Sequence, residues 1–205
     1  MKHFSKSQIN SMDKIFRLNL INSCTGYKSA NLIGTSSDED ILNLAVFSSI
    51  THLGSNPALL GFIVRPTTVP RDSYKNILSN KFFTVNHIHV NDIEDAHHTS
   101  ARYPSKVSEF DMTKFESEYL NGFPAPFVKS SKIKLGCKYL NKYEIKENDT
   151  LLMVAEISDI YFENEYLNKD GWLQLDKAKS VAINGLDGYA LPSLIDRYKY
   201  AKPKK

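Results

Sequence analysis

Short apolar runs separated by polar turns recur through the first part of the chain. Residues 31–35 have strand character, residues 36–40 form a polar turn, and residues 41–49 are predicted to return as the second strand of a hairpin. Ala58 to Val64 is apolar at almost every position, which predicts a strand covered on both faces. Asn56-Pro57 marks the start of this strand.

The second part of the chain alternates more cleanly. Residues 132–139 place three lysines on one face and four apolar side chains on the other, namely Ile133, Leu135, Cys137 and Tyr139. We expect the apolar face to be buried and the lysine face to be wet. Residues 143–145, a turn at Asn148-Asp149 and residues 151–162 predict two further strands.

Helical patterns are few and short. Asp72 is a candidate N-cap, Tyr74, Ile77 and Leu78 fall at helical spacing, and Asn80 is a candidate left-handed end. Residues 82–88 then resume strand character, and a short helix is expected near residues 93–97 within the polar stretch 91–108. Many strands with one or two short helices predict a barrel or a sandwich.

Composition supports one mainly β domain. The 205 residues are 41% hydrophobic and 24% charged, which suffices for one sizeable core. Eleven Phe and eleven Tyr against a single Trp favour a β-rich interior. No repeat, low-complexity block or Gly/Ser-rich linker divides the chain.

Charge and cysteine usage exclude several classes of protein. The net charge of +3 is too small to indicate nucleic-acid binding, although it is compatible with a small anionic ligand. The basic end at 199–205 is expected to be a solvated terminus. Residues 1–16 contain neither a signal peptide nor a membrane span, so a cytoplasmic protein without membrane partners is expected. Cys24 and Cys137 fit neither a zinc site nor a disulfide framework, and both are expected to be reduced and in or near the core.

One segment combines groups that bind phosphate. Arg71 precedes the predicted helix, and the helix start adds the Ser73 hydroxyl and free amides. Ser48 and Ser49, at the end of a neighbouring predicted strand, add further hydroxyl donors. Taken alone, these residues fit a capped surface helix with a solvated arginine better than a phosphate site.

A longer pattern resembles a known family. The run Asn43 to Ser49, the Asn56-Pro57 strand start, the helix start Arg71-Asp72-Ser73-Tyr74-Lys75-Asn76-Ile77 and the Val85-Asn86 strand resemble, in order and spacing, the flavin reductase-like family. Residues 99–104 and 107–110, Gly171-Trp172-Leu173 and residues 187–190 extend the likeness. It covers roughly residues 15–192.

The resemblance implies a split β-barrel with a few peripheral helices, a single domain with its core at about 15–192 and a basic tail at 198–205. It also implies FMN as the cofactor and a homodimer with flavin near the subunit interface. The residues carried over as FMN-binding are Asn31, Asn43, Ala45, Val46, Ser48, Ser49, Arg65, Arg71, Ser73, Asn76, Asn86 and His87. For Asn86 and His87, an ordinary strand end is an equal alternative.

The favoured activity is reduction of flavin by NAD(P)H, with electrons passed on to another acceptor and no catalytic side chain required. The chain has no Gly-rich dinucleotide loop, so nicotinamide is expected to bind transiently over the flavin. One alternative is an electron-transfer flavoprotein reduced by a protein partner. Another is a flavin- or metal-binding module without turnover, because four histidines, His87, His89, His97 and His98, cluster near acidic residues, although without a recognised metal-ligand spacing.

Overall fold

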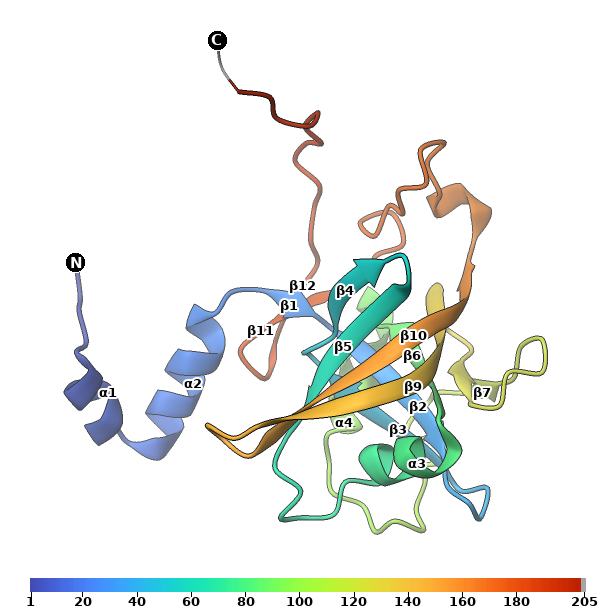
Figure 1. Ribbon diagram of the computed structural model, residues 1–205, viewed down its shortest axis with the longest axis horizontal. Helices are drawn as coiled ribbons and strands as arrows, with labels where there is room; N and C mark the ends of the chain where they lie inside the picture. The colour runs from blue at the N-terminus through green and yellow to red at the C-terminus, as the bar shows by residue number, and fades with distance from the viewer. Residues whose placement is uncertain (204–205) are drawn as a thin grey trace.

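A seven-stranded antiparallel sheet forms the centre of the protein (Figure 1). The structure is a computed structural model that describes residues 1–203. The strand order is β3-β2-β6-β9-β10-β5-β4. In chain order these strands are β2 (Asn31–Ser36), β3 (Leu42–Phe47), β4 (Thr51–Ser55), β5 (Ala58–Val64), β6 (Phe82–His87), β9 (Ile133–Ile145) and β10 (Thr150–Phe162).

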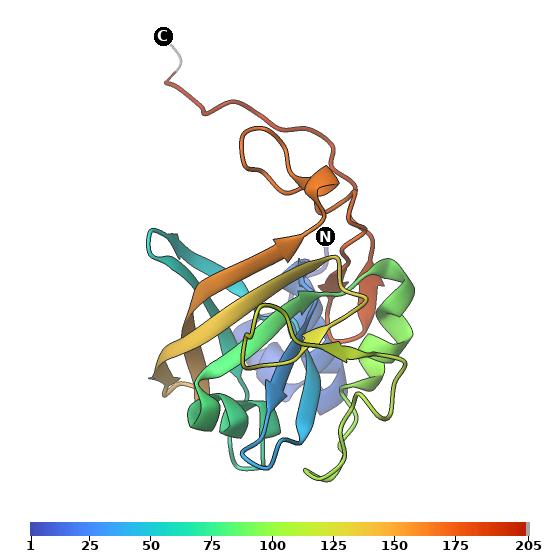
Figure 2. The same cartoon turned by 90° about the vertical axis from the view of Figure 1, so that its right-hand side faces the viewer.

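Smaller elements surround the sheet. The α-helices are α1 (Lys6–Ser11), α2 (Lys14–Cys24), α3 (Asp72–Asn80) and α4 (Ile93–His98), and the 3-10 helices are η1 (Val90–Asp92) and η2 (Asn164–Tyr166). Three short strands, β1 (Lys28–Ser29), β11 (Ala182–Asn184) and β12 (Gly188–Ala190), form a second sheet, and β7 (Ser117–Glu118) pairs with β8 (Phe127–Val128). A view turned by 90° shows α3 at one end of the barrel and α4 beside it (Figure 2).

The large sheet curls until its two ends meet through side chains. The Ile63 amide donates to the Ser49 hydroxyl at 3.0 Å, which joins the chain just after β3 to β5. The rings of Phe47 and Phe62 meet edge to face across the same junction, with centroids 5.4 Å apart. Because β3 and β5 are not neighbours in the sheet order, the barrel is split between them.

Alternation along the strands creates two cores. Ile33, Phe62 and Val85 are fully buried inside the barrel. Leu32 and Leu44 point to the other face, where they join a second cluster beside α4. Successive strand residues face opposite sides of a sheet, so both faces of β2 and β3 are needed to build the two cores.

The predicted mainly β split barrel is confirmed, and β5 has the predicted bounds. β3 ends at Phe47, so Ser48 and Ser49 follow the strand instead of belonging to it. The strands predicted at 132–139 and 143–145 form one continuous strand, β9. No helix within residues 1–203 is long and apolar enough to cross a membrane.

Both predicted ends of α3 were wrong by one residue. Arg71 occupies the N-cap position without a side-chain cap, and Asp72 is the first helical residue. The left-handed residue is Lys81, with φ of 66°, and not Asn80. The Asn80 side chain instead donates to the Ser36 carbonyl at 2.7 Å, which ties the helix to β2, and the chain reverses one residue later.

Three burial predictions were also wrong. β5 was predicted to be covered on both faces, but Leu59 and Ile63 on its outer face are only partly buried, because the core cluster lies on the barrel side. Lys134 is buried on the face predicted to be wet, because its ammonium bonds Glu118 and the Lys129 carbonyl. Cys24 is an exposed free thiol, because it ends α2, a helix without a single buried residue. Cys137 is free and buried, as expected.

The C-terminal segment from Leu191 is exposed and has no regular secondary structure up to residue 203. It extends away from the barrel in Figure 1. The last two residues of the predicted basic tail, 204 and 205, lie outside the described residues.

Gly34 allows another segment to cross β2 closely. A Cβ at this position would lie 2.3 Å from the Pro126 carbonyl oxygen and 2.7 Å from the Thr84 hydroxyl oxygen. We expect Gly34→Ala to lower the free energy of unfolding by about 1–3 kcal/mol through overpacking. Chemical denaturation measures this change. Ser36→Ala in the same strand is the control and should change stability by less than about 0.5 kcal/mol, and equal effects of the two substitutions would contradict the steric explanation.

Candidate functional site

The start of α3 and the start of β3 bring three predicted site residues together. The Asn43 side-chain amide donates to the Ser73 hydroxyl at 2.9 Å. Ser73 lies in the first turn of α3, and Arg71 immediately precedes that helix. The free amides of the first helical turn point out of the helix N-terminus, which is the positive end of the helix dipole. This corner can therefore bind an anion through amide, hydroxyl and guanidinium donors.

Three arginines from separate segments concentrate positive charge at this corner. Burial lowers the pKa of Arg71, and the positive charges of Arg65 and Arg102 lower it further. The Nε atom of Arg71 is buried without a hydrogen-bond partner. Arg102 was not predicted as a site residue, although it lies within the 99–104 segment that contributed to the resemblance. Nothing in the sequence places that segment beside α3.

Asn31 at the start of β2 and His87 at the end of β6 face each other in the strand register. Asn31 is 1% exposed, and both its side-chain nitrogen and its side-chain oxygen lack a partner. Burial lowers the pKa of His87 to about 4, so its imidazole is neutral at physiological pH. These groups can donate to and accept from a polar ligand edge without adding charge.

The free edge of β3 connects the two ends. β3 is the first strand of the sheet and has no backbone partner on its outer side. The Leu44 amide points outward, and because backbone groups alternate, the Val46 amide and carbonyl point outward as well. Asn43 pairs with Thr35 and Phe47 with Asn31, so the two ends lie four residues, or roughly 13 Å, apart.

Glu109 covers part of this edge and was not found from the sequence. Its carboxylate accepts from the outward Leu44 amide at 2.9 Å and is 9% exposed. Burial raises the pKa of Glu109 and the negative charge of Asp72 adds to this, while the bond from the Leu44 amide opposes it. Nothing in the sequence indicates that this glutamate bonds an amide 65 residues earlier in the chain.

Three of the predicted residues hold the fold together through their side chains. The Asn76 amide donates to the Thr35 hydroxyl at 3.1 Å. Asn86 donates to the Leu32 carbonyl at 3.2 Å and accepts from the Val128 amide at 3.0 Å. Ser49 joins β3 to β5, as described above. The remaining predicted residues, Ala45, Val46 and Ser48, lie half-buried along β3 and just after it.

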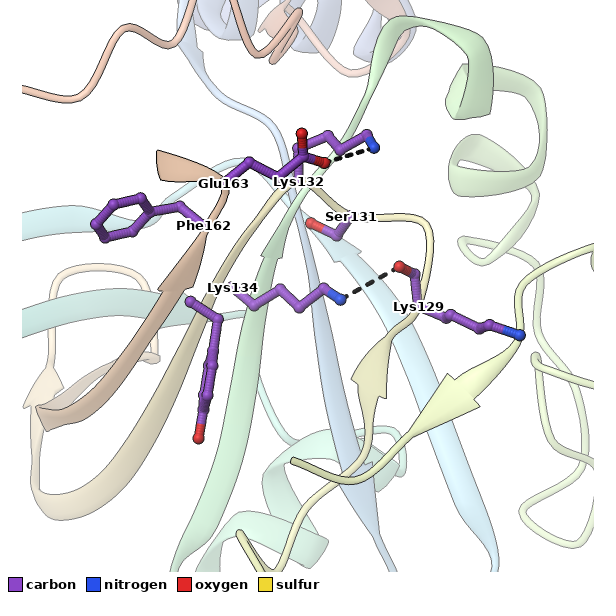
Figure 3. A pocket seen from close by; sticks show the side chains of 7 residues that line it. Lys129, Ser131, Lys132, Lys134, Phe162 and Glu163 are labelled. Carbon is purple, nitrogen blue, oxygen red and sulfur yellow. Dashed lines mark hydrogen bonds and ion pairs between the residues drawn. The ribbon is translucent and has the colours of Figure 1, made fainter. Parts of the chain in front are cut away.

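A pocket of about 170 Å³ lies elsewhere, near the end of β10 (Figure 3). Lysines line it, but Lys132 pairs with Glu163 at 2.8 Å and Lys134 pairs with Glu118, so their charges are largely neutralised. None of the predicted site residues lines this pocket. Within residues 1–203, no group of three or more His, Cys, Asp or Glu side chains is placed to hold a metal ion.

The unpartnered buried atoms test whether the β3 edge fits FMN. Across residues 1–203, four buried side-chain atoms lack a hydrogen-bond partner. Three of them belong to predicted site residues, the two amide atoms of Asn31 and Nε of Arg71, and the fourth is Oδ1 of Asn184. Buried polar groups are nearly always hydrogen-bonded, so these atoms have hydrogen-bonding capacity available for a ligand. A guanidinium at one end and a neutral amide at the other match a phosphate tail and a polar ring edge.

The fold and this edge define a split-barrel protein with a candidate binding site along one free strand. The chain belongs to the flavin reductase like domain family, whose sequence model matches residues 25–178. The family is one of flavin-binding oxidoreductases, which agrees with the resemblance found in the sequence.

Individual proteins resemble the chain to different degrees. The chain is similar to a split-barrel protein of Shewanella frigidimarina NCIMB 400, provisionally described as a flavin reductase, with 41% identity, a TM-score of 0.95 and coverage of 98% of this chain and 100% of that one. An uncharacterised protein of Aquifex aeolicus (strain VF5) is 32% identical over 155 residues, 75% of this chain and 78% of the other. Flavoredoxin of Desulfovibrio vulgaris (Miyazaki F) shares the fold, with 16% identity, a TM-score of 0.74 and coverage of 85% and 92%.

Substitutions at Glu109 separate its hydrogen bond from its charge. Glu109→Ala leaves the Leu44 amide without an acceptor and should lower the free energy of unfolding by about 1–3 kcal/mol. Glu109→Gln keeps an acceptor oxygen and removes a buried charge, so at neutral pH it should be at least as stable as the wild type.

The pH dependence gives a second readout of the same pair. Because the pKa of Glu109 is raised in the folded state, its burial costs stability as pH rises through the interval above its ordinary pKa. The advantage of Glu109→Gln should therefore disappear as the pH falls below that interval. Thermal unfolding across pH measures it, and a difference that does not change with pH would contradict a buried, charged Glu109.

Proposed function

We propose that this protein binds FMN along the free edge of β3 and transfers electrons from NAD(P)H through it to a further acceptor. The observation that carries the proposal is the set of unpartnered buried atoms on Asn31 and Arg71, at opposite ends of one strand edge. Membership in a flavin-binding family makes flavin the ligand that best suits this pair of ends.

The phosphate end is proposed to consist of Arg71, Ser73 and Asn43, with Arg65 and Arg102 adding positive charge. The Asn43–Ser73 hydrogen bond positions the hydroxyl before any ligand arrives, which reduces the entropy lost on binding. Charge-assisted hydrogen bonds from a guanidinium to a phosphate are among the strongest available to a protein.

The ring end is proposed to consist of the outward Val46 backbone, the Asn31 amide and neutral His87. When bound, FMN supplies a ring that accepts a hydride and releases electrons one or two at a time. Amide donors close to the ring edge stabilise negative charge that builds up there on reduction. Burial lowers the pKa of His87 to about 4, so this side chain adds no positive charge to the ring end at neutral pH.

The physiological reductant separates this proposal from its alternative. An electron-transfer flavoprotein, reduced by a redox partner and indifferent to nicotinamide, would use the same FMN site. The flavoredoxin likeness is too distant in sequence to favour that alternative. We further propose that the protein is a homodimer, as the resemblance implies.

Arg71→Ala tests the phosphate end. Loss of a charge-assisted hydrogen bond should weaken FMN binding by about 1.5–3 kcal/mol in a flavin fluorescence titration. Lys75→Ala, which removes an exposed positive charge from the same helix, should have little effect. If Arg71→Ala binds FMN with unchanged affinity, Arg71 is not part of the site. If the wild-type protein retains no flavin absorbance on gel filtration, FMN is not its cofactor.

Anaerobic reduction tests the activity. Protein reconstituted with FMN should lose its flavin absorbance when NADH or NADPH is added without oxygen, because hydride transfer reduces the ring. Dithionite serves as the control reductant and should bleach the same sample. A sample that dithionite bleaches and both nicotinamides leave oxidised would favour the electron-transfer alternative.

A further inference from the structure

The outer edge of β3 presents the same backbone groups more than once. Leu44 and Val46 both turn an amide and a carbonyl outward, because backbone groups alternate along a strand. Two such positions lie roughly 7 Å apart along the strand. A ligand that donates and accepts hydrogen bonds side by side would therefore fit at either position, unless another group distinguishes them.

Glu109 distinguishes the two positions. Its Oε2 accepts from the Leu44 amide at 2.9 Å, so that amide already has a partner before any ligand arrives. Within residues 1–203, no side chain bonds the Val46 amide in this way. Of the two amides, the one at Val46 is therefore the one that can donate to a ligand.

The loop around Glu109 is anchored on both sides. Phe110 is 8% exposed and belongs to the same buried cluster as Leu44. The Phe110 amide donates to the Ser108 hydroxyl at 3.2 Å, and the Thr113 hydroxyl donates to the Glu109 carbonyl at 2.7 Å. A side chain whose support is fixed by packing and by hydrogen bonds can hold a binding site in one geometry.

The space around β3 does not by itself prevent a ligand from binding one position too far along. A groove of about 560 Å³ begins at Leu42, just beyond Asn43, and is lined by Ser108 and Phe110 on either side of Glu109. A flavin displaced by two residues toward this groove would carry its phosphate past Asn43, away from the proposed phosphate contacts. Because the groove has room for that arrangement, a specific contact is needed to exclude it.

We propose that Glu109 is a positioning residue that sets the register of the flavin on β3. Its carboxylate occupies the Leu44 amide, so the ring edge bonds at Val46 and the phosphate reaches the start of α3. This role rests on the proposed FMN site, and it belongs to a residue that contacts the strand and not the flavin. Specificity of this kind comes from denying the wrong arrangement the partner that it needs.

Three substitutions separate the reach of the Glu109 side chain from its charge. Glu109→Gln keeps an acceptor oxygen at the same distance along the side chain and carries no charge. Glu109→Asp keeps the charge but is shorter by one methylene group, and Glu109→Ala removes both the charge and the acceptor. If the hydrogen bond to Leu44 sets the register, Glu109→Gln should behave as the wild type and the other two should not.

The amide resonances of Leu44 and Val46 in NMR spectra report the register directly. Without a ligand, hydrogen exchange at Leu44 should be at least about tenfold faster in Glu109→Asp and Glu109→Ala than in the wild type and Glu109→Gln. Saturating FMN should shift the Val46 resonance of the wild type and leave that of Leu44 in place.

Riboflavin is the decisive probe, because it has the ring without the phosphate and only the strand edge sets its register. It should shift the Leu44 resonance as strongly as that of Val46 in Glu109→Asp and Glu109→Ala, and shift Val46 alone in the wild type and Glu109→Gln. If Glu109→Ala does not fold, Glu109→Asp carries the comparison. If riboflavin does not saturate the wild type, FMN added to the same set of proteins with Arg71→Ala replaces it, since this substitution weakens the phosphate anchor.

The positioning role is overturned if the flavin shifts Leu44 in all of the proteins or in none of them. A shift of Leu44 in Glu109→Gln would overturn it as well, because the charge would then be responsible and not the hydrogen bond. The wild type with FMN reports on the proposed function separately. No shift at any amide would refute the FMN site and the positioning role together, whereas FMN bound at Val46 in the wild type, with the same register in Glu109→Asp, would refute the positioning role alone.

Discussion

The unpaired edge of β3 is the constraint on which the rest of this structure depends. A sheet edge exposes amides and carbonyls that must find partners, and proteins usually block such edges. Here no ladder joins β3 to β5, and the two strands meet through the rings of Phe47 and Phe62, so the outer edge of β3 stays open. Glu109 satisfies one outward amide, at Leu44. The rest of the edge remains the natural place for a ligand that donates and accepts hydrogen bonds side by side.

The edge can remain open because the strands behind it are fixed elsewhere. Asn86 bonds the Leu32 carbonyl and the Val128 amide, which joins β2, β6 and β8 at a single buried side chain. The Thr84 hydroxyl donates to the Pro126 carbonyl at 2.6 Å, above the space that Gly34 leaves open. Side chains that resemble ligand contacts in the sequence thus provide the rigid support that precise binding needs.

The apolar patterns along the chain predicted the strands well. The residues whose burial or role was not predicted are those whose contacts come from distant segments. The apolar run at β5 has the predicted bounds, because its burial is encoded residue by residue. Lys134 was assigned to a wet face by alternation alone, since its partner Glu118 comes from a different part of the chain. Arg102 and Glu109 were not predicted as site residues for the same reason, because the groups they act on come from distant parts of the chain. The apolar run of β5 was predicted to be covered on both faces, and within one chain only the barrel side of it is.

Arg71 shows why the candidate site is more than an assortment of polar residues. A buried guanidinium nitrogen without a partner destabilises a fold, and two neighbouring arginines add repulsion. Both of these neighbouring charges are positive, and each lowers the pKa of Arg71 further. This positive charge suits a ligand whose end is a dianion, because such a ligand relieves the repulsion and supplies the missing acceptor together. A neutral ligand would leave both costs in place, so the electrostatics of this corner favour a phosphate over an uncharged substrate.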